Sequence, residues 1–461
     1  MTRSGRPAGP GLADAAPNRS PWGRAPHVTE KGRPSHSNRI ARFASAVLLF
    51  STGAGFAFSY TGAASQGPVL LLWLAAYAVG AALLIDAVVR LRRRPSVPPW
   101  LLLFIILAAT SALWSETPSV TLRRTFALAG TTVVGLAIAD RLRPVGVFEA
   151  TRKVVLLIAV VSLVLYVLGD PRALDEVHGT LRGVVISKNT LGRILAVGLI
   201  TSAGLAYLDR TRWRVCFASA APMVVALVLT DSAGGLLLSI IGLGAIGAMG
   251  IWRSRRDRLA LCTVLAAGLG IGILAFPNGI SLEDVTQVSG RDTTLTGRTE
   301  IWEESVLAAG ERPLSGYGFG VFWGVGGGGV ESNEAARIRA RLAVPVANAH
   351  NGFLDVTLDL GIPGAIVAAL VLAAAARRGL QDGRAGRVDG ALLRATVVGI
   401  LLVSTATESG LLQENAFLTV LLVVAAAARA DPAKPPTSRV APPDPLRERG
   451  DSSEPALTRS G

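Results

Sequence analysis

The stretch VVLLIAVVSLVLYVLG, from Val154 to Gly169, contains no charged residue. A helix of this length rises about 24 Å, which is close to the thickness of the hydrocarbon core of a bilayer. Similar apolar blocks of roughly 16 to 22 residues recur along the chain, and many of them end in arginine clusters. Strands of a β-barrel would be shorter and would alternate between apolar and polar residues. The pattern therefore predicts membrane-spanning helices.

The composition agrees with this interpretation. Half of the 461 residues are hydrophobic and only 17% are charged, which is more apolar than a soluble domain of this size requires. We therefore predict an all-α integral membrane protein with about twelve transmembrane helices, near residues 43–60, 68–89, 99–114, 125–140, 154–169, 190–208, 214–230, 232–252, 259–276, 361–376, 391–407 and 413–429. The run from Val215 to Trp252 is too long for one crossing, so it requires a turn at Asp231.

The two ends of the chain differ from the part between them. Residues 1–42 are rich in Pro, Gly, Ser and Arg, and residues 431–461 are similar, so both are predicted to be disordered tails. The first apolar block begins too far from the N-terminus for a removed signal peptide. This leaves residues 43–430 as one polytopic membrane domain.

The distribution of basic residues predicts the orientation, because cytoplasmic loops are enriched in Lys and Arg. If the N-terminus is cytoplasmic, the inside segments carry 34 basic residues and the outside segments 11. Both termini are then cytoplasmic. The longest connection, residues 277–360 between the ninth and tenth spans, lies on the outer face of the cytoplasmic membrane. Its aromatic residues and a helix-prone stretch from Glu331 to Arg341 indicate that it folds.

The net charge of +14 does not predict nucleic-acid binding, because the basic residues interrupt hydrophobic blocks and form no continuous basic stripe. Cys216 and Cys262 lie in apolar blocks without other metal ligands at suitable spacing, so they are interpreted as small hydrophobic residues. The sequence predicts no cofactor and no metal.

Three outside stretches place polar groups next to a membrane. They are RGVVISKN (182–189), LTGRTEIW (295–302) and AHNGFLD (349–355). Arg291 precedes the second stretch in the same long loop. If the fold joins these parts, they form a cationic pocket with one histidine, and the residues concerned are Arg182, Lys188, Arg291, Arg298 and His350. Guanidinium groups suit the oxygens of a lipid-linked diphosphate, and a histidine can remove a proton from an incoming hydroxyl without a metal.

Simpler interpretations are available for each of these residues. An arginine at the membrane edge is often an anchor or part of a surface ion pair, and a histidine next to a span can cap or pack. Arg193, Asp231 and Glu408 lie at or within span ends, where ionisable residues are costly and often functional, but pairing with another helix explains them equally well.

The glycine-rich segment from Pro313 to Gly329 superficially suggests a phosphate-binding loop. It lacks the GK[ST] ending of that motif and a strand before it, and it is predicted to lie outside the cell, so we reject this interpretation. Its aromatic residues could stack on sugars, although we favour a position in the membrane interface.

The chain resembles the family of O-antigen ligases and O-antigen polymerases, which are bacterial membrane glycosyltransferases. The resemblance covers most of the membrane region, and its motifs are Arg182-Gly183 with Lys188-Asn189, Thr296-Gly297-Arg298 with Trp302, Pro313-Leu314 with Gly316-Tyr317-Gly318, and His350-Asn351 with Leu360-Gly361-Ile362-Pro363-Gly364. The last of these, at the end of a long outside loop, is the most specific.

The resemblance implies a metal-independent, inverting transfer of a glycan from undecaprenyl diphosphate onto a sugar hydroxyl. Its catalytic residues would be Arg182 and Arg298, which hold the diphosphate, and His350, which assists the acceptor. The further residues expected to bind substrate are Lys188, Asn189, Arg291, Trp302, Tyr317 and Asn351. The family commonly has Ser-Arg after the seventh span, whereas here Ser232 precedes Ala233, and Lys188 and Arg291 are candidate replacements for that cation.

The resemblance leaves the particular reaction open between ligase and polymerase, and the loop motifs favour an exopolysaccharide polymerase. Its partners would be the lipid-linked donor, an acceptor glycan or lipid-linked sugar, membrane lipids and polysaccharide-assembly proteins. A secondary transporter of an anionic solute or envelope precursor is the competing class, because twelve helices with both ends inside are common there. The motif-bearing loop and the lack of matching half-sequences argue against a transporter. A non-catalytic scaffold is a third alternative.

Overall fold

The computed structural model describes residues 36–52, 66–175, 179–251, 296–324, 332–343 and 346–429. These residues form helices joined by turns, with one isolated β-bridge between Leu174 and Leu181 and no named strand. The predicted all-α membrane fold is therefore confirmed. The span expected at 259–276 and the later part of the span expected at 43–60 lie outside the described residues.

Ten of the described helices lie in the predicted membrane region in addition to α14, which is itself long and apolar enough to cross a membrane. Their bounds are α1 His36–Ser51, α3 Gln66–Val89, α4 Pro99–Thr110, α5 Pro118–Arg141, α6 Pro144–Val167, α7 Lys188–Leu208, α8 Trp213–Thr230, α9 Ala233–Ile251, α15 Val388–Thr407 and α16 Phe417–Ala427. Three short 3-10 helices connect some of them, η2 Ser111–Leu113, η3 Pro171–Ala173 and η4 Arg210–Arg212. The remaining helices are α12 Thr296–Glu311, α13 Asn333–Leu342 and α14 Gly352–Arg384.

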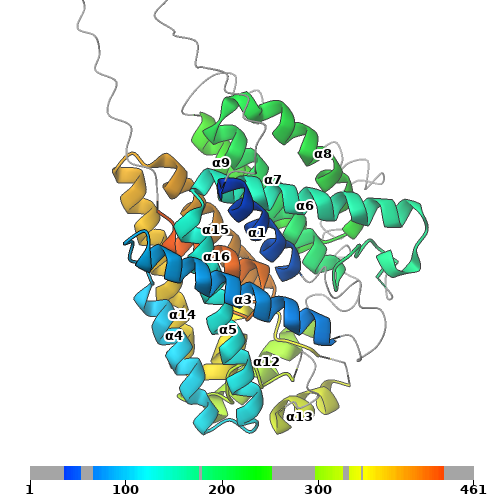
Figure 1. Cartoon of the computed structure of the whole chain (residues 1–461). Coiled ribbons are helices and arrows are strands. Elements are labelled where there is room, and N and C mark those ends of the chain that lie inside the picture. The colour runs from blue at the N-terminus through cyan, green and yellow to red at the C-terminus, as the bar shows by residue number, and fades with distance from the viewer. Residues whose placement is uncertain are drawn as a thin grey trace, which may run out of the picture. The chain divides into compact units, whose positions relative to one another are not determined.

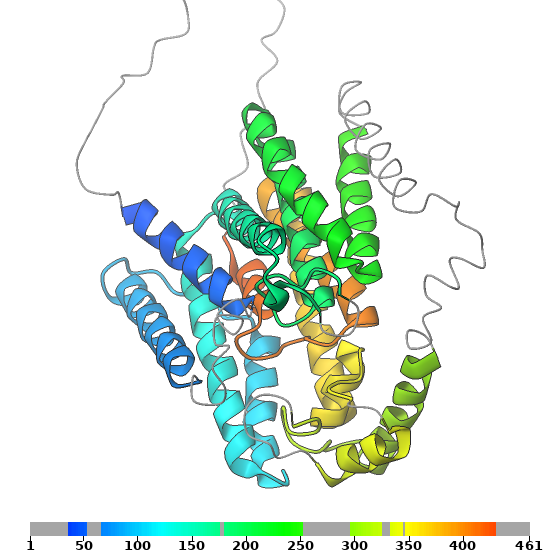
Figure 2. The same cartoon turned by 90° about the vertical axis from the view of Figure 1, so that its right-hand side faces the viewer.

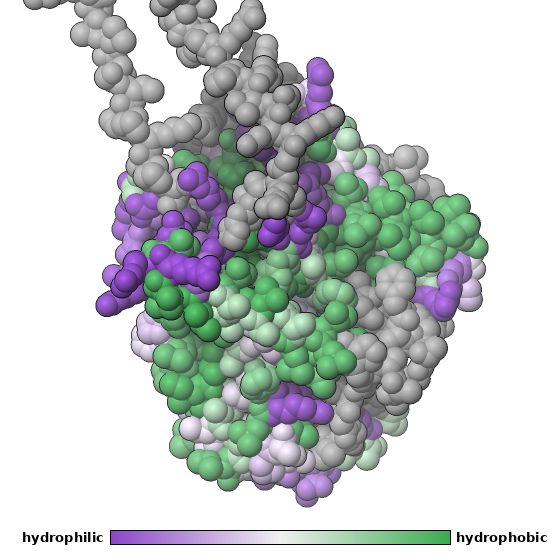
Figure 3. Space-filling view, viewed as in Figure 1, coloured by the Kyte–Doolittle hydropathy of each residue, from purple (hydrophilic) through white to green (hydrophobic). Residues whose placement is uncertain are grey.

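Among the described helices, seven are long and apolar enough to cross a membrane, and three shorter apolar helices accompany them, Pro99–Leu113, Ala233–Ala248 and Phe417–Ala427. Many large hydrophobic side chains on these helices are exposed, including those of Leu71, Leu113 and Val167. Figure 3 shows broad hydrophobic areas on one face, with hydrophilic residues gathered mainly in its upper part. Such a surface is stable when lipid covers it.

The core lies where the membrane helices pack around α7 and α16 (Figure 1). α7 contacts α6, α8 and α9, whereas α16 contacts α5 and α15. Glycines allow the closest approaches. A Cβ atom built on Gly235 of α9 would lie 2.8 Å from the Cα of Gly192 in α7. Small residues at such contacts are typical of helix packing in membranes.

The predicted turn between α8 and α9 is confirmed. α8 ends at Thr230, Asp231 adopts a left-handed conformation with φ of 50°, and α9 begins at Ala233. Ser232 caps α9, because its Oγ accepts a hydrogen bond from the backbone N–H of Gly235 at 3.3 Å.

The helix expected from residue 361 begins earlier, at Gly352. Asn351 starts it by accepting hydrogen bonds at Oδ1 from the N–H groups of Phe353 and Leu354, each at 3.1 Å. Gly361, with φ of 68° and ψ of −173°, interrupts the helix where the span was expected to begin. A Cβ atom at Gly361 would lie 2.6 Å from the carbonyl carbon of Leu314, so the docked loop leaves no room for a side chain.

The segment from Pro313 to Gly324 packs against the first half of α14. The N–H of Tyr317 donates to the carbonyl of Leu358, and that of Gly318 donates to the carbonyl of Asp359, both at 2.9 Å. The N–H of Phe319 donates to Ser111 Oγ at 3.0 Å, which attaches the segment to the end of α4. Figure 2 shows α12 and α13 at the lower end of the molecule, beside the start of α14.

The aromatic residues of this segment correct one expectation. Tyr317, Phe319, Phe322 and Trp323 are all buried, and the rings of Tyr317 and Phe322 meet edge to face. They fill the space between the segment and the helices around it instead of facing the membrane interface. The charged helix expected near Glu331 to Arg341 is present as α13.

Candidate functional site

Glu408 forms the end of α15 and brings together residues from three other parts of the chain. Its N–H still donates to the carbonyl of Ser404, while its backbone is extended and turns the side chain out of the helix. Oε1 accepts hydrogen bonds from Asn189 Nδ2 and from Arg298 Nη2, both at 3.2 Å. Oε2 lies 3.4 Å from Nδ1 of His350. We call Asn189, Arg298, His350 and Glu408 the Glu408 cluster.

Four helix N-termini meet at this cluster. Asn189 is in the first turn of α7, and its Oδ1 accepts a hydrogen bond of 3.4 Å from Ser232, the residue before α9. Arg298 is the third residue of α12, and His350 precedes the capping residue of α14. A helix N-terminus carries partial positive charge and unpaired N–H groups, so this arrangement attracts anions.

Glu408 remains ionised in this setting. Its side chain is only 12% exposed, and burial alone would raise the pKa of its carboxyl group. The hydrogen bond from His350 and the charges of Arg193 and Arg298 outweigh burial, so the pKa falls below its ordinary value. The carboxylate is therefore a fixed negative charge shared by several cationic groups.

Arg193 is a further cation next to the Glu408 cluster. It lies one turn after Asn189 in α7, and its Nη1 donates to the carbonyl of Ser409 at 2.9 Å. An arginine within a membrane helix is costly unless it is paired. Here the carbonyl of Ser409 and the nearby Glu408 carboxylate compensate its charge.

His350 is held in an unusual backbone conformation, with φ of 48°. Its N–H donates to Asn348 Oδ1 at 3.0 Å, and the same oxygen accepts a hydrogen bond of 3.0 Å from Ser409 Oγ. Trp302 of α12 donates from Nε1 to the carbonyl of Ala349 at 2.8 Å. These contacts fix a left-handed conformation that a histidine seldom adopts, and they leave the side chain 31% exposed.

The structure thus brings together three of the predicted site residues, namely Asn189, Arg298 and His350. Lys188 is adjacent to them at the start of α7, with Nζ 3.9 Å from Asp231 Oδ2 and a side chain that is 17% exposed. Asn351 caps α14, as described above.

Other predicted site residues have different positions. Arg182 donates from Nε to the carbonyl of Arg172 at 3.1 Å. Arg291 lies outside the described residues. Tyr317 is 2% exposed, and its hydroxyl donates to the carbonyl of Ala308 at 3.0 Å. Its side chain therefore packs inside the segment from Pro313 to Gly324, and its predicted contact with a substrate stays a prediction.

Sequence reasoning did not assign Glu408 or Arg193 to the site, although both stood out as ionisable residues at or within span ends. Their charge at a span end is visible in the sequence, but the sequence does not show which residues they pair with. Nothing in the sequence pointed to Asn348, because its role is to accept hydrogen bonds from the His350 N–H and the Ser409 hydroxyl. In the described part of the chain, no group of three His, Cys, Asp or Glu residues could hold a metal ion.

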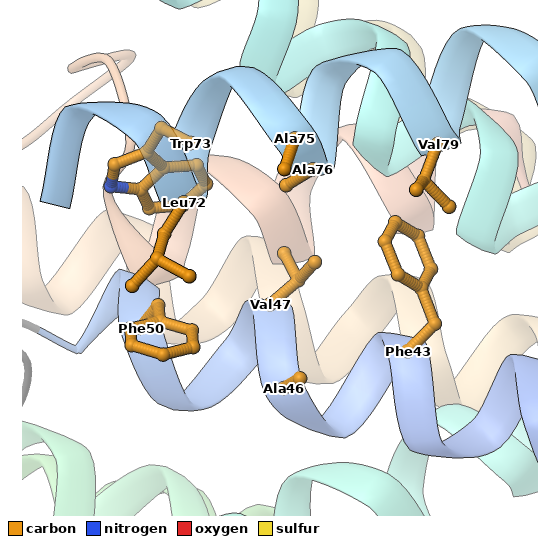
Figure 4. Close-up of a pocket in the computed structure, with 9 residues that line it drawn as sticks. All are labelled: Phe43, Ala46, Val47, Phe50, Leu72, Trp73, Ala75, Ala76 and Val79. Atoms are coloured by element: carbon orange, nitrogen blue, oxygen red, sulfur yellow. The ribbon is translucent and has the colours of Figure 1, made fainter. Parts of the chain in front are cut away.

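A separate groove of about 200 Å³ lies between α1 and α3 (Figure 4). Only apolar side chains line it, among them Phe43, Phe50 and Trp73. An ionised group would lose its hydration there without gaining a hydrogen bond, so this groove is unsuited to a diphosphate. None of the predicted site residues lines it.

Two comparisons with known proteins connect this arrangement to a family. A family described as O-antigen ligase matches residues 218–369, a segment that contains Arg298 and His350. The exopolysaccharide production protein ExoQ of Rhizobium meliloti (strain 1021) is 26% identical over 289 residues. That match spans 60% of this chain and 64% of the relative. Together the matches support an O-antigen ligase/polymerase-like family, and the resemblance predicted from sequence is confirmed.

Proposed function

We propose that the protein is a membrane glycosyltransferase that joins glycan from an undecaprenyl-diphosphate-linked oligosaccharide to a sugar hydroxyl. The carrying observation is the Glu408 cluster, where His350 and Arg298 meet among helix N-termini. An exposed imidazole beside a guanidinium provides a base next to an anion-binding group. The O-antigen ligase match and the relative named for exopolysaccharide production support the same class of reaction.

The donor diphosphate is the group that the cationic side of the site would hold. Arg298 offers a planar set of donors, and Lys188 and the start of α7 add positive charge nearby. Negative charge grows on the diphosphate as its bond to the sugar breaks, so these groups stabilise the transition state more than the ground state. Arg182 and Arg291 remain proposed additional contacts to the same diphosphate.

His350 would act on the acceptor. It takes the proton of the acceptor hydroxyl while that oxygen attacks the anomeric carbon from the side opposite the diphosphate. The new bond joins the acceptor oxygen to this carbon, and the electrons of the broken bond leave with the diphosphate. The configuration is therefore inverted, and the proton on His350 later passes to water. The step as written requires no metal.

The reaction favoured is polymerisation, in which the acceptor is itself a lipid-linked sugar, because the relative ExoQ is named for exopolysaccharide production. A ligase would use the same residues with a different acceptor. The site would face the outer side of the cytoplasmic membrane, with both termini in the cytoplasm. This orientation follows from the excess of basic residues in the opposite loops.

The test measures glycan transfer by the purified protein in liposomes. The liposomes contain lipid-linked repeat units, isolated from cells that produce this protein. We expect longer saccharides on the lipid diphosphate, released undecaprenyl diphosphate and an unchanged rate in the presence of EDTA. Protein-free liposomes are the control. If the repeat units instead cross the membrane without being joined, the protein is a transporter and the proposal is wrong.

A further inference from the structure

The two oxygens of Glu408 have different partners. Oε1 accepts from Arg298 and Asn189, on the side that we assign to the donor, whereas Oε2 faces Nδ1 of His350, on the side of the acceptor. We propose that Glu408 is a positioning residue, which sets the orientation and tautomer of His350, and that its contact with His350 depends on the occupancy of Arg298. This inference rests on the proposed function and adds a regulatory link within the same site.

The tautomer follows from hydrogen-bond chemistry. An ionised carboxylate can only accept hydrogen bonds, so the nitrogen that faces Glu408 must carry a proton. That nitrogen is Nδ1, at 3.4 Å. In neutral His350 the lone pair is then on Nε2, at the opposite edge of the ring. The exposed part of the side chain can therefore present an unprotonated nitrogen to an acceptor hydroxyl.

The backbone around His350 supports the same orientation. Asn348 Oδ1 binds both the N–H of His350 and the hydroxyl of Ser409, the residue next to Glu408. One amide oxygen thus connects the two segments that carry the base and the carboxylate. His350 cannot move away from Glu408 without losing this connection.

Arg298 supplies the dependence on the donor. While the site is empty, the guanidinium of Arg298 is paired with Glu408 at 3.2 Å and reduces the negative potential that His350 experiences. A diphosphate competes for the same guanidinium. Once Arg298 turns to the diphosphate, the Glu408 carboxylate is left with the hydrogen bonds from Asn189 and His350, and its contact with His350 becomes stronger.

The charges that face this pair come from several elements. Arg298 is on α12, Arg193 is on α7, and Asp355, which senses His350 through its charge, is on α14. Of these three residues, Arg298 is the one whose ion pair with the Glu408 carboxylate is direct, at 3.2 Å. The donor-dependent change is therefore assigned to Arg298, whereas Arg193 and Asp355 are constant.

The first test is a double-mutant cycle with Glu408→Gln and His350→Ala, measured by single-turnover transfer at several pH values. Glu408→Gln alone should slow transfer by about 10²-fold, because the imidazole is no longer held in the tautomer that leaves Nε2 free to accept the proton. In the His350→Ala background the same change should have little effect. Glu408→Asp should recover part of the rate.

Glu414→Gln is the matched control. Glu414 lies in the same connection between α15 and α16 and is paired with Arg124 at 3.5 Å instead of with His350. Its effect should simply add to that of His350→Ala. If Glu408→Gln slows transfer equally in the presence and absence of His350, the inference is wrong. Transfer by the wild-type protein would still support the proposed function in that case.

A second test does not depend on transfer. The sequence contains four histidines, so replacing His27, His36 and His178 leaves His350 as the single ¹⁵N-histidine signal. We expect the Nδ1–H tautomer in this variant and the Nε2–H tautomer after Glu408→Gln, because the amide can donate to Nδ1. An Nε2–H form beside intact Glu408 would contradict the inference. The expected tautomer in a protein that transfers no glycan would instead contradict the proposed function.

Discussion

The indole of Trp302 donates a hydrogen bond of 2.8 Å to the carbonyl oxygen of Ala349, the residue before His350. Through this bond α12, which carries Arg298, also holds the backbone that presents the histidine. The arginine and the histidine are far apart in the sequence, yet one helix determines the position of both. A displacement of α12 would therefore affect the donor and acceptor sides of the site together.

Trp302→Phe should slow transfer about fivefold, because it keeps the aromatic packing but removes one hydrogen bond worth about 1 kcal/mol. Binding of undecaprenyl diphosphate should change little. Trp114→Phe is the matched control, since the Trp114 indole donates to the carbonyl of Ser315 at the same distance of 2.8 Å, away from His350. Equal losses in the two variants, in single-turnover measurements, would show that Trp302 has no special relation to the site.

Arg298→Lys should weaken binding of undecaprenyl diphosphate by about tenfold, because it keeps the charge but loses the planar donors of the guanidinium. The measurement is the dissociation constant in nanodiscs. Arg337→Lys, on the exposed side of α13, is the control and should bind as the wild type does. Arg182→Lys tests the other predicted arginine in the same way. Unchanged affinity in both Arg182→Lys and Arg298→Lys would rule out the proposed clamp.

The fold could be predicted well from the sequence, because its main signal is the length of uncharged blocks. α6 and α7 agree with the expected spans within a few residues at their C-terminal ends, and the turn at Asp231 lies where a single crossing became too long. The start of α14 was missed. Residues 352–360 include Asp355 and Asp359, so hydropathy alone did not reveal the helix that Asn351 caps.

The site could be predicted only in part. His350 and Arg298 were proposed because their residue types suit the chemistry, but Glu408 lies 58 residues from one and 110 from the other. Pairing over such distances depends on how helices pack, and hydropathy gives no information on it. The burial of Tyr317 could not be predicted for the related reason that burial of an aromatic ring in a loop depends on neighbours that the local sequence does not reveal.

Cysteine accessibility should confirm the orientation inferred from the basic residues. In a background without Cys216 and Cys262, Glu303→Cys on exposed α12 should react with an impermeant maleimide added outside intact cells. Arg93→Cys, between α3 and α4, should react only after the membrane is permeabilised. The reverse pattern would place the site in the cytoplasm, and the use of an outward-facing lipid donor would have to be abandoned.

The lowered pKa of Glu408 has a consequence for stability. Because the carboxyl pKa is lower in the folded protein than the ordinary value of 4.5, the group stabilises the fold above that pH and loses this contribution as pH falls through the folded-state pKa. The apparent melting temperature should therefore decrease in acid more strongly for the wild type than for Glu408→Gln. Glu303→Gln, an exposed change on α12, should follow the wild type. Parallel curves for the wild type and Glu408→Gln would contradict the assigned ion pairs.

His350→Ala should reduce the rate of single-turnover transfer from a defined lipid-linked oligosaccharide by about 10²-fold to 10⁴-fold, with donor binding largely retained. The reason is that His350 is partly exposed and its Nδ1 is occupied by Glu408, so its remaining nitrogen is available for the acceptor proton. Asn348→Ala is an informative companion, because it leaves the imidazole in place and removes the side chain that binds the His350 N–H. It should give a smaller loss of rate.

The two measurements separate the roles that His350 could have. A base is needed only in the chemical step, so its loss lowers the rate and spares the affinity for donor, whereas a cation that holds phosphate is needed in both. If donor affinity collapses in His350→Ala, the histidine contacts phosphate, and the proton must go to another group. If transfer continues at the wild-type rate, His350 has no catalytic role, and its contact with Glu408 serves only to join α14 to α15.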